Sequence, residues 1–294
     1  MDSAPTDETA AGVEGSAALE LRGADVLPLL HRISTQALLD LAPGDARATL
    51  FCDFRGRLLH RAVVAIARDG AVWLLRDDAP GAPLAAFVGR HVFREDVKIA
   101  DRSGEQWVEA VESPPDTAPG VVERDGGPGR VTAGDGATLI VHPGPAPEHT
   151  PEAWAERGRR RIRMGRAGHG HEIAEEFNPF EVGLGGDVHL DKGCFTGQEA
   201  LQRLVTYDSV RRRLARVAGR GLAPVAPADV TCDGERAGVL TSAAEDATIE
   251  EPGLWIGLAV LKREIAESGR ALVVYGQRLD ALNLLPMPRA LGRP

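Results

Sequence analysis

The sequence predicts an α+β protein that ends in a small β-barrel. Up to Arg213, apolar residues recur first with the period of a helix and then with that of strands, in the order helix, hairpin, strand, helix, strand. Beyond it, short apolar runs are separated by turn signals such as Asp233-Gly234 and Pro252-Gly253, a pattern typical of a barrel. We therefore predict three segments, a disordered tail, an α+β region and a barrel, over 1–16, 17–213 and 214–294.

Apolar periodicity and turn residues place the individual elements. The segment 113–136 is rich in Pro, Gly and Asp and is predicted to be a long, poorly ordered loop. Helices are predicted at 26–33, 84–88, 151–163 and 198–205. Strands are predicted at 17–21, 71–75, 92–99, 107–111, 137–141, 188–190, 214–217, 239–241, 255–260 and 271–274, with a hairpin at 47–66.

Composition limits the possible functions. The chain has 294 residues, 43% of them hydrophobic, and a net charge of −9, which favours solubility and argues against wholesale nucleic-acid or membrane binding. No apolar run approaches the roughly 20 residues that span a bilayer. The first 16 residues lack the basic and apolar regions of a targeting signal. We therefore expect a cytoplasmic protein without a membrane partner.

The three cysteines, Cys52, Cys194 and Cys232, are widely spaced and form no CxxC pair. This pattern fits a reducing compartment. An iron–sulfur cluster is ordinarily held by about four cysteine thiolates. This chain has three cysteines, so it cannot hold a cluster by cysteine alone. Any cluster ligated here would need ligands from a partner or a second subunit, and no resident metal is predicted.

Cys194 stands out because of its neighbours. Thr196 followed by Glu199 is a capping-box pattern, so Cys194 should lie just before a helix N-terminus, where a thiolate is favoured. Lys192 would add a full positive charge, and it is one of only three lysines. We predict that Cys194 and Lys192 carry the chemistry; the alternative is a buried structural cysteine in a glycine-bracketed turn.

A second candidate site precedes this motif. Asn178-Pro179 favours a turn, which would place Glu181 on a locally fixed backbone. A carboxylate held in this way can accept two parallel N–H bonds from a guanidine-like edge, such as that of a reduced pterin. The alternative is that Glu181 only caps the turn.

Two arginine clusters could bind an anion or RNA. Arg157, Arg159, Arg160, Arg161 and Arg163 fall in the second half of one predicted helix, and Arg211-Arg212-Arg213 precede the barrel. A solvated helix face is the more common outcome for such a cluster. Direct binding of nucleic acid is therefore a secondary expectation.

The run Lys192-Gly-Cys-Phe-Thr-Gly-Gln-Glu199 resembles the signature of the YgfZ family, folate-binding relatives of the glycine cleavage T protein that support iron–sulfur proteins. The Asn178–Leu184 run is similar to one in T-protein relatives. The resemblance, which starts near Leu19, implies two ferredoxin-like α+β lobes and a barrel arranged as a three-lobed ring around a tetrahydrofolate pocket. It also implies partners that are iron–sulfur clients, including tRNA-modifying enzymes, or cluster carriers. The implied folate-binding residues are Asn178, Glu181, Gln198, Glu199 and Arg163.

The chain departs from its relatives at two places. The stretch 56–61, where the T protein has a catalytic aspartate, contains no carboxylate. Arg163 stands where many folate-binding relatives have glutamate, and it could instead meet the glutamate tail of folate. We therefore rank a folate-dependent iron–sulfur assembly or repair factor first, with Cys194 as a redox-active thiol or transient cluster ligand. A tetrahydrofolate-dependent aminomethyltransferase ranks second, and an adaptor for protein or tRNA third.

Overall fold

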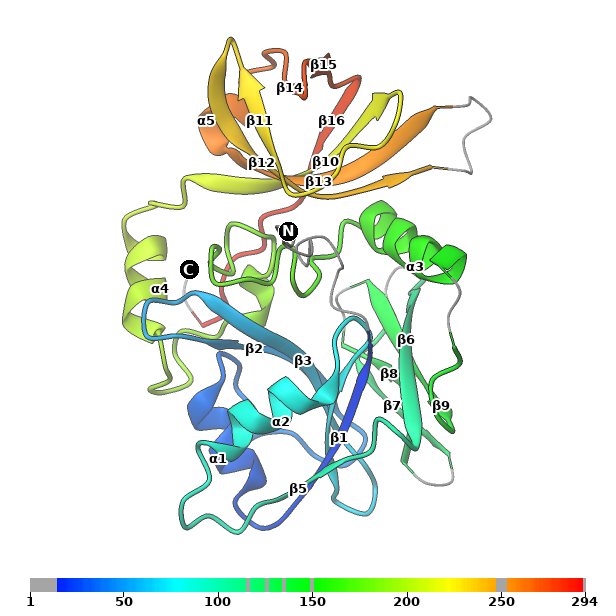
Figure 1. Ribbon diagram of the computed structural model, residues 1–294. Coiled ribbons are helices and arrows are strands. Elements are labelled where there is room, and N and C mark those ends of the chain that lie inside the picture. Colours follow the sequence, from blue (N-terminus) through cyan, green and yellow to red (C-terminus); the bar gives the residue numbers. More distant parts are fainter. Residues whose placement is uncertain are drawn as a thin grey trace, which may run out of the picture.

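Three antiparallel sheets form the protein in the computed structural model (Figure 1). The structure describes residues 15–114, 117–124, 127–133, 136–148, 151–246 and 253–292. The strand orders are β2-β3-β4-β1-β5, β6-β9-β8-β7 and β15-β14-β11-β12-β13-β10-β16. The expected α+β class is confirmed, with strands predominating.

The first sheet is buried on both faces. Leu19 and Leu21 of β1 pack against the helices α1 and α2, whereas Ala18, just before Leu19, faces the second sheet, as the two-residue period of a strand requires. This explains why most residues of its inner strands β1, β3 and β4 are apolar. The elements are β1 Ala17–Arg22, α1 Val26–Ile33, β2 Ala46–Cys52, β3 Leu58–Ile66, β4 Val72–Arg76, α2 Gly81–Gly89 and β5 Lys98–Asp101.

The second sheet corrects the predicted loop over 113–136. Two strands of that segment form a hairpin, and Val131 is fully buried between the first two sheets. Gly127 is required there because an added Cβ would lie 2.9 Å from the Trp73 ring. The predicted strand 92–99 is also wrong, because only its last two residues enter β5. The strands of this sheet are β6 Gln106–Glu112, β7 Gly120–Arg124, β8 Gly127–Thr132 and β9 Ala137–Pro143.

The third sheet is curled into a half-barrel (Figure 1). Along β13, Leu258 and Val260 face the centre of the molecule, whereas Ala259 and Leu261 fill the inside of the curl. The elements are β10 Arg212–Arg220, β11 Ala228–Cys232, β12 Glu235–Glu245, β13 Leu254–Lys262, α5 Arg263–Ala266, β14 Val273–Val274, β15 Gln277–Arg278 and β16 Ala281–Leu284.

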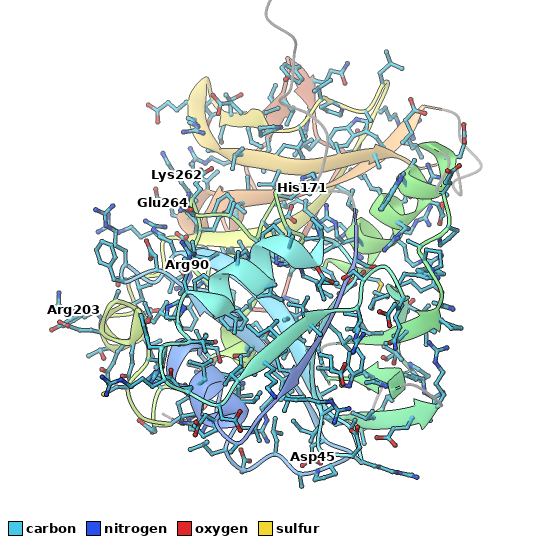
Figure 2. The ribbon with its side chains drawn as sticks, turned by 60° about the horizontal axis from the view of Figure 1, so that its bottom comes forward. Asp45, Arg90, His171, Arg203, Lys262 and Glu264 are labelled. Atoms are coloured by element: carbon cyan, nitrogen blue, oxygen red, sulfur yellow. The ribbon has the colours of Figure 1, made fainter. Side chains whose placement is uncertain are left out.

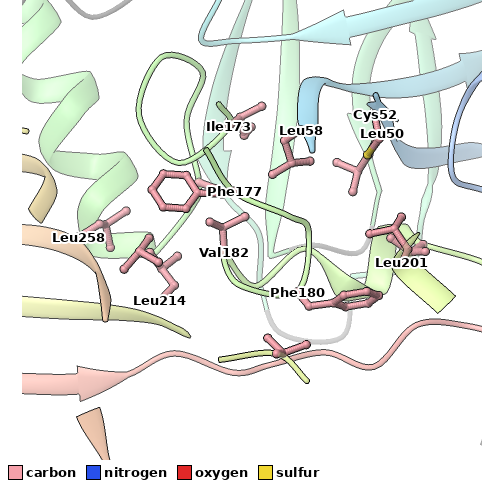
Figure 3. Close-up of a cluster of buried hydrophobic side chains, with 14 of the residues drawn as sticks. Leu50, Cys52, Leu58, Ile173, Phe177, Phe180, Val182, Leu201, Leu214 and Leu258 are labelled. Atoms are coloured by element: carbon pink, nitrogen blue, oxygen red, sulfur yellow. The ribbon is translucent and has the colours of Figure 1, made fainter. Parts of the chain in front are cut away.

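A central hydrophobic cluster joins the first sheet to the half-barrel (Figure 3). Phe177 and Val182 lie between Leu58 of β3 and Leu214 of β10. The connecting elements are the helices α3 Pro151–Met164 and α4 Gln198–Thr206 and the 3-10 turn η1 Gly185–Asp187. The strand predicted at 188–190 is wrong: the segment forms one isolated bridge, from His189 to Leu291.

The first 14 residues of the predicted tail lie outside the described residues. Ser16 belongs to the fold, because its hydroxyl accepts the Val108 N–H at 3.0 Å. Within the described ranges, no helix has the length and apolar character needed to cross a lipid bilayer. The division into segments at 213 and the three-lobed ring stay predictions.

Candidate ligand hollow and thiol loop

A hollow that is open to solvent lies between β3, the end of α3, η1 and the chain after β16. We call it the central hollow. Its apolar wall includes Val182, Leu184, Leu214 and Pro286. These residues come from three separate parts of the sequence, so the hollow exists only in the folded molecule. An apolar cavity with a few polar groups is the usual form of a small-molecule site.

The polar groups of the central hollow belong to ion pairs. Arg61 of β3 donates from Nε to Asp187 of η1 at 2.7 Å, and both side chains are nearly buried. Arg166 donates to both carboxylate oxygens of Asp77, at 3.2 and 3.1 Å. A guanidinium and a carboxylate therefore lie together at the wall and can offer both donors and acceptors to a heterocycle.

The sequence prediction did not include Arg61, Arg166 or Asp187 as site residues. Asp187 follows two glycines, Gly185 and Gly186, and an added Cβ on Gly185 would lie 2.0 Å from the Pro288 carbonyl oxygen. In the sequence, the two adjacent glycines were the available sign that another segment packs closely against this one. It did not reveal which segment approaches.

Glu181 lies on the turn that Asn178-Pro179 predicts. Asn178 Oδ1 accepts the Phe180 and Glu181 N–H groups at 3.0 and 3.3 Å, and Glu181 Oε2 accepts the Asn178 N–H at 3.1 Å. Both side chains are buried. The turn therefore fixes the Glu181 carboxylate without help from a ligand.

The Glu181 carboxylate already forms an ion pair with a guanidinium of the protein. Arg212 donates from Nε to Oε1 at 2.7 Å and from Nη2 to Oε2 at 3.0 Å, and Arg57 Nη1 lies 3.7 Å from Oε2. The two parallel bonds expected of a pterin are made here by Arg212. A pterin would have to displace it to reach Glu181, so Glu181 as a folate ligand stays a prediction.

The motif residues 191–196, which we call the thiol loop, precede α4. Cys194 is exposed, whereas Cys52 and Cys232 are buried, and burial strongly raises the pKa of the Cys52 thiol. The expected helix follows, but the capping box is wrong. The N-cap is Gly197, at φ 84°, and the Thr196 side chain makes no capping hydrogen bond. Glycine takes this left-handed conformation without strain.

Lys192 contacts other groups than the thiol. Its ammonium donates to the carbonyl of His31 and lies 5.0 Å from the Phe195 ring centroid. Burial lowers the pKa of Lys192 to about 8. Within the described part of the chain, neither a hydrogen bond nor an ion pair joins Lys192 to Cys194, so the role of Lys192 in activating the thiol stays a prediction.

The remaining predicted folate ligands are dispersed. Gln198 donates from Nε2 to the Leu190 carbonyl at 2.8 Å, and Glu199 is exposed and pairs with Arg203, which projects from the edge of the molecule (Figure 2). Arg163 pairs with Asp246 at 2.5 Å and with Glu156 at 3.5 Å. None of the three is assigned to the lining of the central hollow.

The arginines of α3 bond other parts of the protein. Arg161 donates to Glu172, which is fully buried, at 2.7 Å, and to Ser242 of β12 at 2.7 Å. Arg157 donates to the Asp77 carbonyl, and Arg160 reaches the Ala110 carbonyl at 3.4 Å. The helix therefore ties the half-barrel to the other two sheets, which is a structural use of the charge run.

Sequence comparisons connect the chain with transferases. It is 32% identical over 161 residues to a protein of Arabidopsis thaliana named as a chloroplastic transferase; the match spans half of this chain but only 35% of that relative's length. It is 28% identical to the aminomethyltransferase of Rubrobacter xylanophilus, over 91% of this chain and 79% of that protein. The aminomethyltransferase of Geobacillus kaustophilus is 27% identical over the same share of the chain. A comparison with protein-family models finds no match.

A solved structure extends this similarity to the fold. The glycine cleavage system aminomethyltransferase T from Bartonella henselae superposes with a TM-score of 0.68, covering 96% of this chain and 89% of its own. Sequence identity between the two is 15%. The chain therefore has the T-protein fold, and its relatives in sequence include aminomethyltransferases.

Proposed function

We propose that this protein binds a reduced folate in the central hollow and uses the exposed Cys194 thiol to support the assembly or repair of iron–sulfur clusters in client proteins. The central hollow supports the first part: apolar side chains suit the flat faces of a pterin, and the Arg61–Asp187 pair suits its polar edge. The accessibility of Cys194 alone among the three cysteines supports the second part.

An iron–sulfur cluster is cargo in this proposal. Among the described residues, no three His, Cys, Asp or Glu side chains gather in a way that could hold a metal ion. Cys194 therefore supplies one ligand, and a client or cluster carrier supplies the others. A cytoplasmic location belongs to the same proposal. Nucleic acid is a weaker candidate for a direct partner because the α3 arginines bond the protein itself.

Filling the central hollow tests folate binding. Gly186 lines the central hollow, its φ is ordinary, and the nearest atom to an added Cβ is 3.6 Å away. Gly186→Leu should lower the affinity for tetrahydrofolate, measured by calorimetric titration, about tenfold or more because the side chain occupies ligand volume. Gly104→Leu, at an exposed glycine with no neighbour within 4 Å, is the control. Equal affinities for the two variants would contradict binding in the hollow.

Replacement of the thiol tests the second part. Cys194→Ser, supplied to a strain that lacks this protein, should abolish client activation, because an alcohol is a much weaker iron ligand than a thiolate and undergoes no thiol redox chemistry. Tetrahydrofolate binding by the same variant should be unchanged, which shows that it is folded. Full complementation by Cys194→Ser would exclude the thiol mechanism.

Aminomethyl transfer to tetrahydrofolate is the second candidate, and Asp187 favours it. The hairpin stretch 56–61 contains no carboxylate, but Asp187 places one in the central hollow. Incubating the protein with an aminomethyl donor and tetrahydrofolate would reveal methylenetetrahydrofolate if this function holds. Turnover that is lost in Asp187→Asn would displace the first proposal.

A further inference from the structure

Lys192 and His31 exchange hydrogen bonds. The Lys192 ammonium donates to the His31 carbonyl, and His31 Nε2 lies 2.9 Å from the Lys192 carbonyl oxygen. His31 Nδ1 accepts the Leu38 N–H at 3.1 Å, so the ring proton resides on Nε2 and is donated to Lys192. Two segments that lie far apart in the sequence are thereby joined in both directions.

The ammonium lies at a place that favours a cation. Helix α1 ends at Ile33, and the N–H of Thr35, which would continue the helix by bonding to His31, bonds to Leu50 instead, at 2.9 Å. The His31 carbonyl is therefore one of the open acceptors of the helix C-terminus, where the macrodipole is negative. The protonated side chain of Lys192 satisfies this acceptor.

The second contact of the ammonium lies within the thiol loop. Phe195 is buried, and the face of its ring lies 5.0 Å from Lys192 Nζ, within the range of a cation–π interaction. Gly193 and Cys194, both exposed, connect these two residues. Lys192 and Phe195 therefore contact each other across the thiol loop, and the Cys194 thiol lies on the exposed segment between them.

Hydrogen bonds also anchor Leu190 and Gln198, the residues on either side of the thiol loop. Gln198 Nε2 donates to the Leu190 carbonyl at 2.8 Å, which closes the thiol loop. The Leu190 N–H donates to the Leu291 carbonyl at 3.0 Å. These bonds hold the residues that flank the loop. Among the described residues, Gly193 and Cys194 form no hydrogen bond, so their position depends on the contacts of the flanking Lys192 and Phe195.

We propose that Lys192 is a positioning residue: by binding the C-terminus of α1 and the Phe195 ring at the same time, it holds Cys194 in a fixed, outward position. The benefit to client proteins rests on the function proposed above. A thiol that is already ordered loses less conformational freedom when it meets a partner than a thiol on a mobile loop.

A nitroxide spin label on Cys194 tests the proposal in the full chain, because Cys52 and Cys232 are buried and do not compete for the reagent. In Lys192→Met, the rotational correlation time of the label should fall by about twofold or more relative to the wild type. Lys192→Arg should restore it, since a guanidinium donates to the same carbonyl and stacks on the same ring. Lys98→Met, at an exposed lysine of β5, is the matched control and should leave the spectrum unchanged.

His31→Asn provides a second variant, which removes the ring but keeps the main-chain carbonyl that Lys192 binds. In His31→Asn, the rotational correlation time of the label should fall less than it does in Lys192→Met. An unchanged spectrum in Lys192→Met would overturn the proposal, and so would a failure of Lys192→Arg to restore it. The measurement uses neither folate nor a client, so it stands independently of the proposed function.

Discussion

At the scale of single residues, the Glu181–Arg212 pair shows how a binding motif can be satisfied within the protein. The Glu181 side chain is 8% exposed and that of Arg212 27%, and the two parallel hydrogen bonds lie at the boundary between the central cluster and β10. Desolvated charges of this kind are costly to leave unpaired. The pair therefore constrains both segments, whether or not a ligand reaches it.

A double-mutant cycle tests this constraint. Arg212→Met should lower the free energy of unfolding by about 3 kcal/mol, because it leaves the buried Glu181 carboxylate with only the longer contact to Arg57. The double variant Glu181→Met, Arg212→Met should lose clearly less. Urea denaturation measures both values.

An exposed ion pair supplies the control. Arg203→Met breaks the pair with Glu199, in which both side chains are mostly exposed, and should change the free energy of unfolding by no more than about 0.5 kcal/mol. An equal loss in the single and double variants of the Glu181 pair would show that the charge is not effectively buried.

Lys192 should make stability depend on pH in the alkaline range. Burial lowers its pKa from 10.5 to about 8, so between these values the folded state binds fewer protons than the unfolded state, and stability rises with pH. Partial exposure reduces the effect to the order of 1 kcal/mol. The difference in unfolding free energy between wild type and Lys192→Met should therefore shift in favour of the wild type from pH 7.5 to 10. A constant difference would contradict burial of the ammonium.

At the scale of elements, adjacent glycines in η1 have opposite requirements. A Cβ on Gly185 would lie 2.0 Å from the Pro288 carbonyl oxygen, whereas one on Gly186 would be 3.6 Å from the nearest atom. The first glycine therefore permits the chain after β16 to close over η1. The second only faces the central hollow.

Alanine substitutions should separate the two glycines. Gly185→Ala should lower the free energy of unfolding by about 2 kcal/mol or more, because backbone atoms must shift to admit the methyl group. Gly186→Ala should change it by less than about 1 kcal/mol. Thermal unfolding of the two variants compares them directly, and similar losses would mean that the contact with Pro288 is easily relaxed.

Local sequence determined several elements well. Helix α1 begins and ends where its apolar period does, and the hairpin β2–β3 forms around Gly56, as predicted. The hairpin β7–β8 was missed because its Pro, Gly and Asp content is typical of loops. The hairpin is stabilised by the packing of Val131 against the first sheet, which local sequence does not show. The capping box failed for a related reason: Gly197 lies against the Asp53 carbonyl, a contact that only glycine allows.

At the scale of the whole molecule, three partly buried histidines make the stability of the fold depend on acid. Burial is the main cause that lowers the pKa values of His31 on α1, His60 on β3 and His171 beside β12, that of His60 to about 4. Each therefore binds a proton less readily in the folded state than in the unfolded state, where the ordinary pKa is 6.5. The native state should therefore lose stability as the pH falls from 6.5 to 4.

Denaturation by urea at a series of pH values measures this loss. The midpoint should decrease between pH 6.5 and 4, and His60→Leu should weaken the dependence because it removes the histidine whose pKa is lowered to about 4. An unaltered pH dependence in His60→Leu would assign the acid sensitivity to other groups, such as the buried carboxylate Glu172.

The two candidate sites differed in how far the sequence could predict them. The thiol loop is a contiguous motif, so the exposed Cys194 beside a helix could be anticipated. The partner of Lys192 could not, because His31 lies on a different element and is reached through the folded chain. The central hollow was equally inaccessible, since Arg61, Asp187 and Pro286 meet only after the sheets have assembled.

The wall formed by the chain after β16 has a consequence during synthesis. Arg61 and Asp187 leave the ribosome long before Leu285 and Pro286, which complete the same cavity. Until Leu285 and Pro286 emerge, the nascent protein can form the first two sheets but cannot complete the wall of the central hollow. Enclosure of any small molecule in the central hollow should thus follow the synthesis of the segment after β16.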